Sequence, residues 1–174
     1  MAIISESYGS VTDSTPLVLT AASLATSASM VAMRQSTIVT NVANKFLSAF
    51  VTGQITTGTT PVAGRTIAVY VFVPLSVAAG VFVYPRAGAT LLGEADAAAT
   101  FDAEQRSGAI ILAGAASTNA TSDRAYSVSF DLREAVGYMP LKWGILLVHD
   151  TGVALNATAG NHFFHYVGIK AESV

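Results

Sequence analysis

Three histidines near the end of the chain are the first candidates for chemistry. His149 is followed directly by Asp150, and His162 and His165 lie in the next apolar segment. If these two segments pair as a hairpin, His149 and His162 come close together, but a zinc or nickel site needs three converging ligands. His162 and His165 are three residues apart, so a β-strand points them to opposite faces. We therefore interpret the three as one hydrogen-bonded core histidine and two strand-end histidines, with a metal site as the alternative.

A second group of candidates is the acidic segment, residues 94–106, in an Ala-rich part of the chain. It contains Glu94, Asp96, Asp102, Glu104 and Arg106. A glycosidase holds two carboxyl groups about 5–9 Å apart in a cleft, whereas the one aromatic residue beside these carboxylates is Phe101. We interpret the segment as a solvated acidic loop, with docking to a basic partner surface as the functional alternative.

The other motifs of known chemistry are missing or have a structural interpretation. Nothing in the sequence matches a nucleophile elbow, a phosphate-binding loop or a dinucleotide fingerprint. The chain has no cysteine, which excludes disulfide scaffolds and thiolate zinc sites. Residues 119–121 and 156–158 both read NAT and match the N-glycosylation pattern, but we interpret them as turns held by local side-chain hydrogen bonds. We predict that the protein is not an enzyme and has no catalytic residue, cofactor or metal.

Composition favours a protein that packs against other proteins. The chain has 174 residues, which suggests one domain. Charged residues make up 11% of it, against about 25% in ordinary soluble domains. The net charge of −2 leaves no basic excess for binding nucleic acid. A surface of Ala, Thr and Ser side chains with few ions is typical of proteins that pack against copies of themselves or a partner.

One uncharged stretch, residues 66–85, is long enough to be weighed as a transmembrane helix. Pro74 and Gly80 divide it into pieces of strand length, and Val, Ile, Phe and Tyr dominate it. We therefore predict two buried β-strands and no membrane partner. The first nine residues carry Glu6 and no positive charge, unlike a secretory signal.

Short strand signals recur along the chain, and helix signals are few. We expect strands at residues 17–21, 30–33, 37–40, 45–56, 66–73, 81–84, 109–113, 126–132, 143–149 and 162–169. A helical turn is expected at residues 133–138, with Asp131 as its N-cap and Pro140 stopping it. Residues 91–105 could hold one helix or an exposed loop. The fold class predicted is all-β: a single jelly-roll-type β-sandwich of about eight strands with few short helical turns, formed by residues 16–174 after an N-terminal arm of residues 1–15.

Alternation within the strands assigns faces to the side chains. In segment 45–56 one face carries Leu47, Ala49, Val51 and Ile55, and the other carries Phe46, Ser48, Phe50, Thr52 and Gln54. Two aromatic rings on an otherwise polar strand face are a candidate contact patch. In the last strand His165 is expected to share a face with Phe163, Val167 and Ile169.

Two sets of turn and strand motifs follow one another in a recognisable order. The first set is residues 22–25 (ASLA), 34–37 (RQST), 41–45 (NVANK) and 57–61 (TGTTP). The second is residues 140–144 (PLKWG), 148–158 (VHDTGVALNAT), 161–162 (NH) and 166–169 (YVGI). With these motifs the chain resembles a group of small virion proteins of tailed bacteriophages, similar to head cement or decoration proteins with a jelly-roll sandwich. The resemblance covers residues 15–73 and 124–170, and the middle of the chain, residues 81–121, matches nothing in that group.

The resemblance implies a non-enzymatic cement protein on the capsid surface of the virion, made in the host cytoplasm. Its partners would be the major capsid protein and copies of itself, as a homotrimer. Such a protein binds the outer shell at the joints between capsomers and stabilises it against internal DNA pressure.

Three regions are predicted to make these contacts. They are the N-terminal arm (Ile3, Ile4, Tyr8), the aromatic pair Phe46 and Phe50, and the acidic segment (Glu94, Asp96, Phe101, Asp102, Glu104, Arg106).

Two other functions remain open on the sequence. One is a structural sandwich in the tail, neck or fibres of the virion, for which the same fold and surface would serve. The other is a carbohydrate-binding module that uses Tyr84, Phe101, Trp143 or Tyr166 as a stacking platform.

Overall fold

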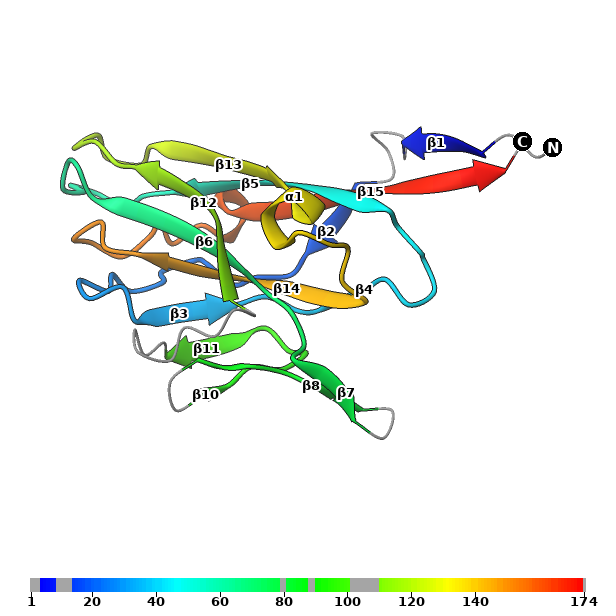
Figure 1. Ribbon diagram of the computed structural model, residues 1–174. Coiled ribbons are helices and arrows are strands. Elements are labelled where there is room, and N and C mark those ends of the chain that lie inside the picture. The colour runs from blue at the N-terminus through cyan, green and yellow to red at the C-terminus, as the bar shows by residue number, and fades with distance from the viewer. Residues whose placement is uncertain (1–3, 9–13, 79–80, 88–89, 101–109, 174) are drawn as a thin grey trace.

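The computed structural model describes residues 4–8, 14–78, 81–87, 90–100 and 110–173. It is mostly β, with 47% of residues in strands and 6% in helices (Figure 1). The strands are β1 (Ile4–Tyr8), β2 (Thr15–Leu17), β3 (Ala32–Gln35), β4 (Val39–Thr40), β5 (Ser48–Thr56), β6 (Thr66–Phe72), β7 (Ser76–Ala78), β8 (Val81–Val83), β9 (Arg86–Ala87), β10 (Thr90–Leu91), β11 (Ala97–Thr100), β12 (Ile110–Ser117), β13 (Ala125–Asp131), β14 (Lys142–His149) and β15 (Phe163–Ser173). The helical elements include α1 (Leu132–Val136) and the 3₁₀ turn η3 (Ala159–Asn161). No described helix is long and apolar enough to cross a membrane.

Eight main strands form four antiparallel pairs rolled into a sandwich. From the ends of the chain inwards, β2 pairs with β15, β3 with β14, β5 with β13, and β6 with β12. These pairs are divided between two sheets, which we call the β5 sheet (β2, β15, β5, β13, with β1 added at β15) and the β6 sheet (β3, β14, β6, β12, with β4 and β11 added). Such nesting of strand pairs in two packed sheets is the topology of a jelly roll. The predicted fold class is confirmed.

Strands β6 and β14 are buried on both faces. The core between the sheets takes alternate residues of these strands: Ile67, Val69, Val71, Trp143, Ile145 and Leu147. A second core on the outer side of the β6 sheet takes the residues between them: Ala68, Tyr70, Phe72, Leu146 and Val148. The continuous apolar run over residues 66–73 was predicted to be a strand covered on both sides, and this is confirmed.

The second core is covered by the long connection between β6 and β12. This connection contains β7 to β11, and its Tyr84, Leu92 and Ala99 are buried in the second core. Strand β11 also pairs with β3 and so extends the β6 sheet. The connection lies along the outer side of β3 and β14 as a further layer (Figure 1).

The helical turn begins as predicted and ends earlier than expected. The Asp131 carboxylate accepts a hydrogen bond from the Glu134 N–H at 3.1 Å, which is the N-cap geometry. Helix α1 ends at Val136 because Gly137 takes a left-handed conformation with φ of 87° and closes the last turn onto Arg133. Gly137, rather than Pro140, terminates the helix.

Two segments differ from the sequence-based expectation. Residues 91–105 were expected to be a helix or an exposed loop, but residues 97–100 form β11, and residues 101–105 lie outside the described part. The first strand of the sandwich covers Thr15–Leu17 rather than residues 17–21. An Ala-rich segment has no alternation to reveal a strand, so pairing with β3 decides the conformation of β11.

Substitution of Gly53 tests the packing of the β5 sheet. Gly53 lies opposite Phe164, and a Cβ at Gly53 would collide with the Phe164 ring, which is only 2% exposed. We expect Gly53→Ala to destabilise the fold by about 1–3 kcal/mol or more, because the buried ring must leave its place. The measurement is urea unfolding, and Gly160→Ala is the control, since a Cβ there meets nothing within 4 Å. Equal midpoints for the two variants would contradict the described packing.

Candidate functional site

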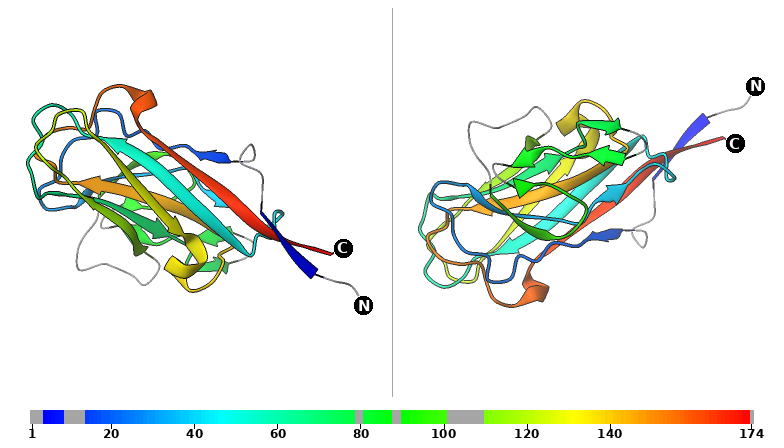
Figure 2. Two further views of the ribbon diagram at one scale, coloured as in Figure 1. Left: turned by 90° about the horizontal axis from the view of Figure 1, so that it is seen from above. Right: turned by 90° about the horizontal axis from the view of Figure 1, so that it is seen from below.

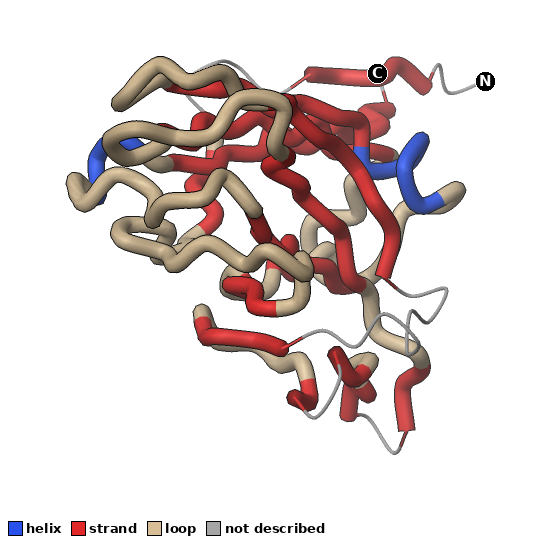
Figure 3. Tube along the Cα trace, turned by 90° about the vertical axis from the view of Figure 1, so that its left-hand side faces the viewer, coloured by secondary structure: helices blue, strands red, loops and turns tan. Residues whose placement is uncertain are grey.

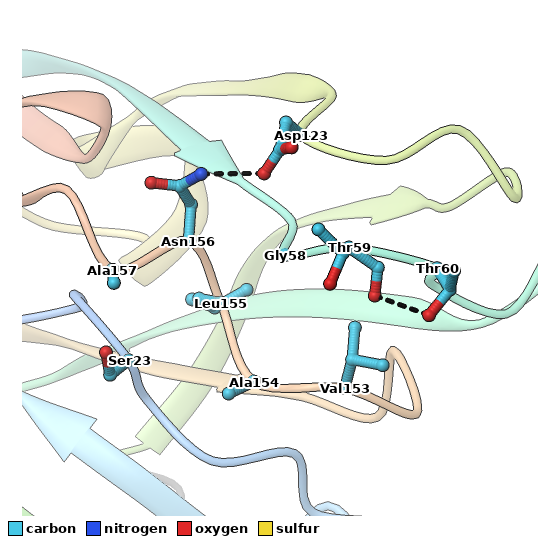
Figure 4. Close-up of a pocket in the computed structure, with 10 residues that line it drawn as sticks. All are labelled: Ser23, Gly58, Thr59, Thr60, Asp123, Val153, Ala154, Leu155, Asn156 and Ala157. Atoms are coloured by element: carbon cyan, nitrogen blue, oxygen red, sulfur yellow. Dashed lines mark hydrogen bonds between the residues drawn. The ribbon is translucent and has the colours of Figure 1, made fainter.

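Four connections meet at one end of the sandwich and surround an open pocket of about 510 Å³. They are residues 18–31, 57–65, 118–124 and 150–162, and we call this the loop end. Figure 3 views the molecule from this end and shows the loops in front of the sheets. The pocket is lined by Ser23, Gly58, Thr59, Thr60, Asp123, Val153, Ala154, Leu155, Asn156 and Ala157 (Figure 4).

Asn156 joins the loops around the pocket. Its side-chain N–H donates to the Asp123 carboxylate at 2.7 Å (Figure 4). Its side-chain oxygen accepts from the Thr158 N–H at 2.9 Å and from the Asn161 amide at 3.1 Å. Asn119 likewise accepts from the Thr121 N–H at 3.0 Å. The interpretation of both NAT triplets as turns held by local side-chain bonds is confirmed.

The pocket can bind a polar group but carries no pair of groups for proton transfer. Asp123 is the one carboxylate among its lining residues, and none of them is a histidine, lysine or arginine. Glycoside hydrolysis needs a second carboxyl group beside the same bond, and the lining supplies none. The lining also has no aromatic ring on which a sugar could stack.

His149 and His162 are structural groups behind the loop end. The His149 Nε2 lies 3.1 Å from the Leu24 carbonyl, and its Nδ1 lies 3.0 Å from the Thr151 hydroxyl. The His162 Nε2 donates to the Asn156 carbonyl at 2.8 Å, and its Nδ1 accepts from the Thr56 N–H at 3.3 Å. Both rings are buried, so two core histidines are present where one was expected. Burial lowers the pKa of His149, although the Leu24 carbonyl opposes this effect.

His165 lies apart from the other two rings. It sits on the outer face of the β5 sheet, with its ring 5.6 Å from the Phe163 ring, whereas His162 faces the interior. The prediction that His162 and His165 point to opposite faces is confirmed. Among the described residues there is no group of three His, Asp or Glu side chains that could hold a metal ion.

Two carboxylates of the acidic segment hold the long connection onto the sandwich. Asp96 accepts from Arg34 Nε at 2.6 Å and from the backbone N–H and hydroxyl of Thr20 at 3.1 and 2.5 Å. Burial opposes ionisation of Asp96, but the bonds from Arg34 and Thr20 prevail and hold its pKa below the usual value. Glu94 contacts Lys142 at 2.6 Å and accepts from the Tyr84 hydroxyl at 3.0 Å, and these bonds lower its pKa.

The predicted contact residues are divided by the structure. Phe46 turns inward and packs edge-on against the buried Tyr166 ring at 6.3 Å, while Phe50 is 47% exposed on the outer face of β5. They therefore form no joint patch. Ile4 and Tyr8 lie in β1. Ile3, Phe101, Asp102, Glu104 and Arg106 lie outside the described residues.

Three rings considered as a sugar platform are buried. Trp143 is fully buried, and Tyr84 and Tyr166 are less than 10% exposed. Their ring faces are covered by the two cores, so they supply no stacking surface. The fourth candidate, Phe101, lies outside the described residues.

The outer face of the β5 sheet is bare, and we call it the bare face. Phe50 is paired with Val167, and Phe163 with Gln54, so the exposed rings lie on adjacent strands. Thr52, Ser127 and Ser129 fill the face between and beside them and are exposed. The alternation of residues 163, 165, 167 and 169 was the sequence signal for this face, and it is confirmed. Phe163 is 42% exposed. The sequence did not predict it as a contact residue, because this strand was considered only for the chemistry of His162 and His165.

Comparisons with known proteins leave the family open. No family model, no curated protein and no solved structure matches the chain.

The buried His149 makes stability depend on pH. Its pKa is lowered in the folded state, whereas a histidine in an unfolded chain titrates near pH 6.5. The unfolded state therefore binds the proton first, so this contribution is present in full above about pH 6.5 and is lost as the pH falls. We expect the free energy of unfolding to fall below pH 6.5 by up to about 1.4 kcal/mol per pH unit. His149→Gln should flatten this slope in urea titrations, and the control His165→Gln should keep it. An unchanged slope in His149→Gln would contradict the assignment.

Substitution of Asp96 tests the anchoring of the long connection. Its side chain is 13% exposed and Arg34 is 25% exposed, so the pair is partly shielded from solvent. We expect Asp96→Asn to destabilise the protein by about 1–3 kcal/mol, because charge-assisted bonds are lost. Glu94→Gln is the matched control, since Glu94 is 60% exposed and should cost less than about 1 kcal/mol. Thermal unfolding measures both, and the reverse order would show that Asp96 is not the anchor.

Proposed function

We propose that this chain is a non-enzymatic structural protein of a bacteriophage virion, a cement or decoration protein of the capsid. In this role it binds the outer shell at the joints between capsomers, with the major capsid protein and copies of itself as partners, and works as a homotrimer. It stabilises the shell against the pressure of the packaged DNA.

The observation that carries the proposal is the difference between the two outer faces of the sandwich. The outer side of the β6 sheet is covered over β3, β14 and β6 by the second core and the described part of the long connection, whereas Leu112 on the edge strand β12 stays 55% exposed. The bare face exposes Phe50 and Phe163 among hydroxyl side chains, with Asp131 as a charged group at its margin that is already bonded to Ser48 and the α1 N-terminus. An uncharged face with exposed rings is suited to burial against another protein surface.

The energetics of such a face suit a repeated structural contact. Burying apolar area contributes about 25 cal/mol per Å², and much of this is offset by the loss of translational and side-chain freedom on association. The net free energy of a single contact can then be small, whereas many copies across a shell together resist its expansion. A jelly roll hosts many functions, so the proposal depends on the face and the resemblance rather than on the fold.

Removing the two exposed rings should weaken binding to the shell. We expect Phe50→Ser/Phe163→Ser to lower the affinity for particles that lack the chain by at least about tenfold, a loss of about 1.4 kcal/mol. Co-sedimentation with purified particles measures this. Val62→Ser is the control, because Val62 is 45% exposed but lies at the loop end.

The location on the particle separates the remaining alternatives. Antibodies to the chain, applied to intact particles of the phage that carries the sequence, should label the head. Label on the tail, neck or fibres would replace the capsid role by the other structural role. Absence of the chain from purified particles would overturn the virion proposal as a whole.

A further inference from the structure

Strand β15 extends beyond the sandwich with one partner strand. β5 pairs with β15 from Phe163 to Ile169, and β1 pairs with it from Ile169 to Ser173. Within the described chain, residues 170–173 and 4–7 therefore form a two-stranded antiparallel ribbon, which we call the ribbon. Figure 2 shows the ribbon projecting from the body in two views, at the end opposite the loop end.

A projecting ribbon of two strands lacks the support that stabilises a sheet. An isolated two-stranded pair is marginal in water, and three or more strands or a packed layer are needed for stability. Each strand of the ribbon also has an outer edge that no strand of the described chain occupies. Backbone N–H and C=O groups on such an edge are a template for pairing with a further strand.

Exposed apolar side chains lie on connections at the same end of the sandwich as the ribbon. The Leu47 N–H donates to the Ile169 carbonyl at 2.7 Å, where the ribbon leaves the sheet, and the Asn41 N–H donates to the Leu141 carbonyl at 2.7 Å. Val42, Leu47 and Leu141 on these connections are 51%, 37% and 55% exposed. We call these three side chains the collar. A strand partner at the ribbon would bring its own body close to the collar and cover it.

We propose that the ribbon pairs through main-chain hydrogen bonds with the ribbon of a second copy of this chain, and that the collar is buried in the same contact. A second copy suits this site because every copy brings the same two free edges. Two ribbons together make four strands, which passes the number needed for a stable sheet. The same pairing repeated from copy to copy can close a ring of three. This inference rests on the self-association in the proposed function and assigns it to one end of the molecule.

Four proteins test the proposal by light scattering behind a sizing column. The full chain should have the mass of three chains. Deletion of residues 1–8 should shift the mass to one chain that still unfolds cooperatively, because β1 pairs only with β15 in the described structure. Leu47→Ser/Leu141→Ser should weaken the contact and raise the concentration needed to form the oligomer by at least about tenfold. Val62→Ser, exposed at the loop end, is the matched control and should keep the mass of the full chain.

Amide hydrogen exchange tests the pairing without any substitution. In a lone ribbon the N–H groups of each strand alternate between bonded and free. In a closed ring of three every copy uses both edges of its ribbon, so residues 4–7 and 170–173 should both show continuous protection that disappears on dilution to the monomer.

The outcomes separate this inference from the proposed function. An oligomer that survives the deletion and the collar variant would overturn the ribbon proposal and leave the virion role standing. A full chain that is a monomer at all concentrations would overturn the ribbon proposal and the homotrimer together, while labelling of particles still decides the virion role.

Discussion

The burial of β6 and β14 on both faces is the constraint on which the rest of the molecule depends. Neither strand has a polar side, so each needs an apolar layer above and below. The β5 sheet supplies one layer, and the connection between β6 and β12 supplies the other with Tyr84, Leu92 and Ala99. A two-sheet sandwich alone would leave Tyr70, Phe72 and other large side chains in water.

This constraint explains what became of the acidic segment. A connection that covers a core must be held in place, and Asp96 holds it to Arg34 and Thr20 while Glu94 holds it to Lys142 and Tyr84. Charges that the sequence presents as a solvated loop therefore act within the fold. With β3, β14 and β6 covered on the outer side, the outer face of the β5 sheet is a strand surface that the described residues leave open.

The two ends of the sandwich are built differently. At the loop end the connections are joined to one another by hydrogen bonds such as Asn156 to Asp123 and His149 to Leu24, and they surround the open pocket. At the other end a strand pair leaves the body beside exposed apolar side chains. Within the described chain, the strand edges of the ribbon at this end have no further partner strand.

The sequence by itself determined the features that depend on neighbouring residues. Alternation marked the faces of β13 and β15, a continuous apolar run marked β6 as covered twice, and Asp131 marked the start of α1, because these signals arise from the local geometry of strands and caps. The number of short strands and the turns between them also predicted the sandwich fold class. Tertiary structure alone decided which groups meet across the chain. Asp96 contacts Arg34, which is 62 residues away in the sequence, and β1 near the N-terminus pairs with β15 near the C-terminus. Phe46 packs against the buried Tyr166 ring, whereas Phe50 is exposed on the outer face of β5. Such contacts depend on the path of the whole backbone, and the pattern of neighbouring residues does not specify that path.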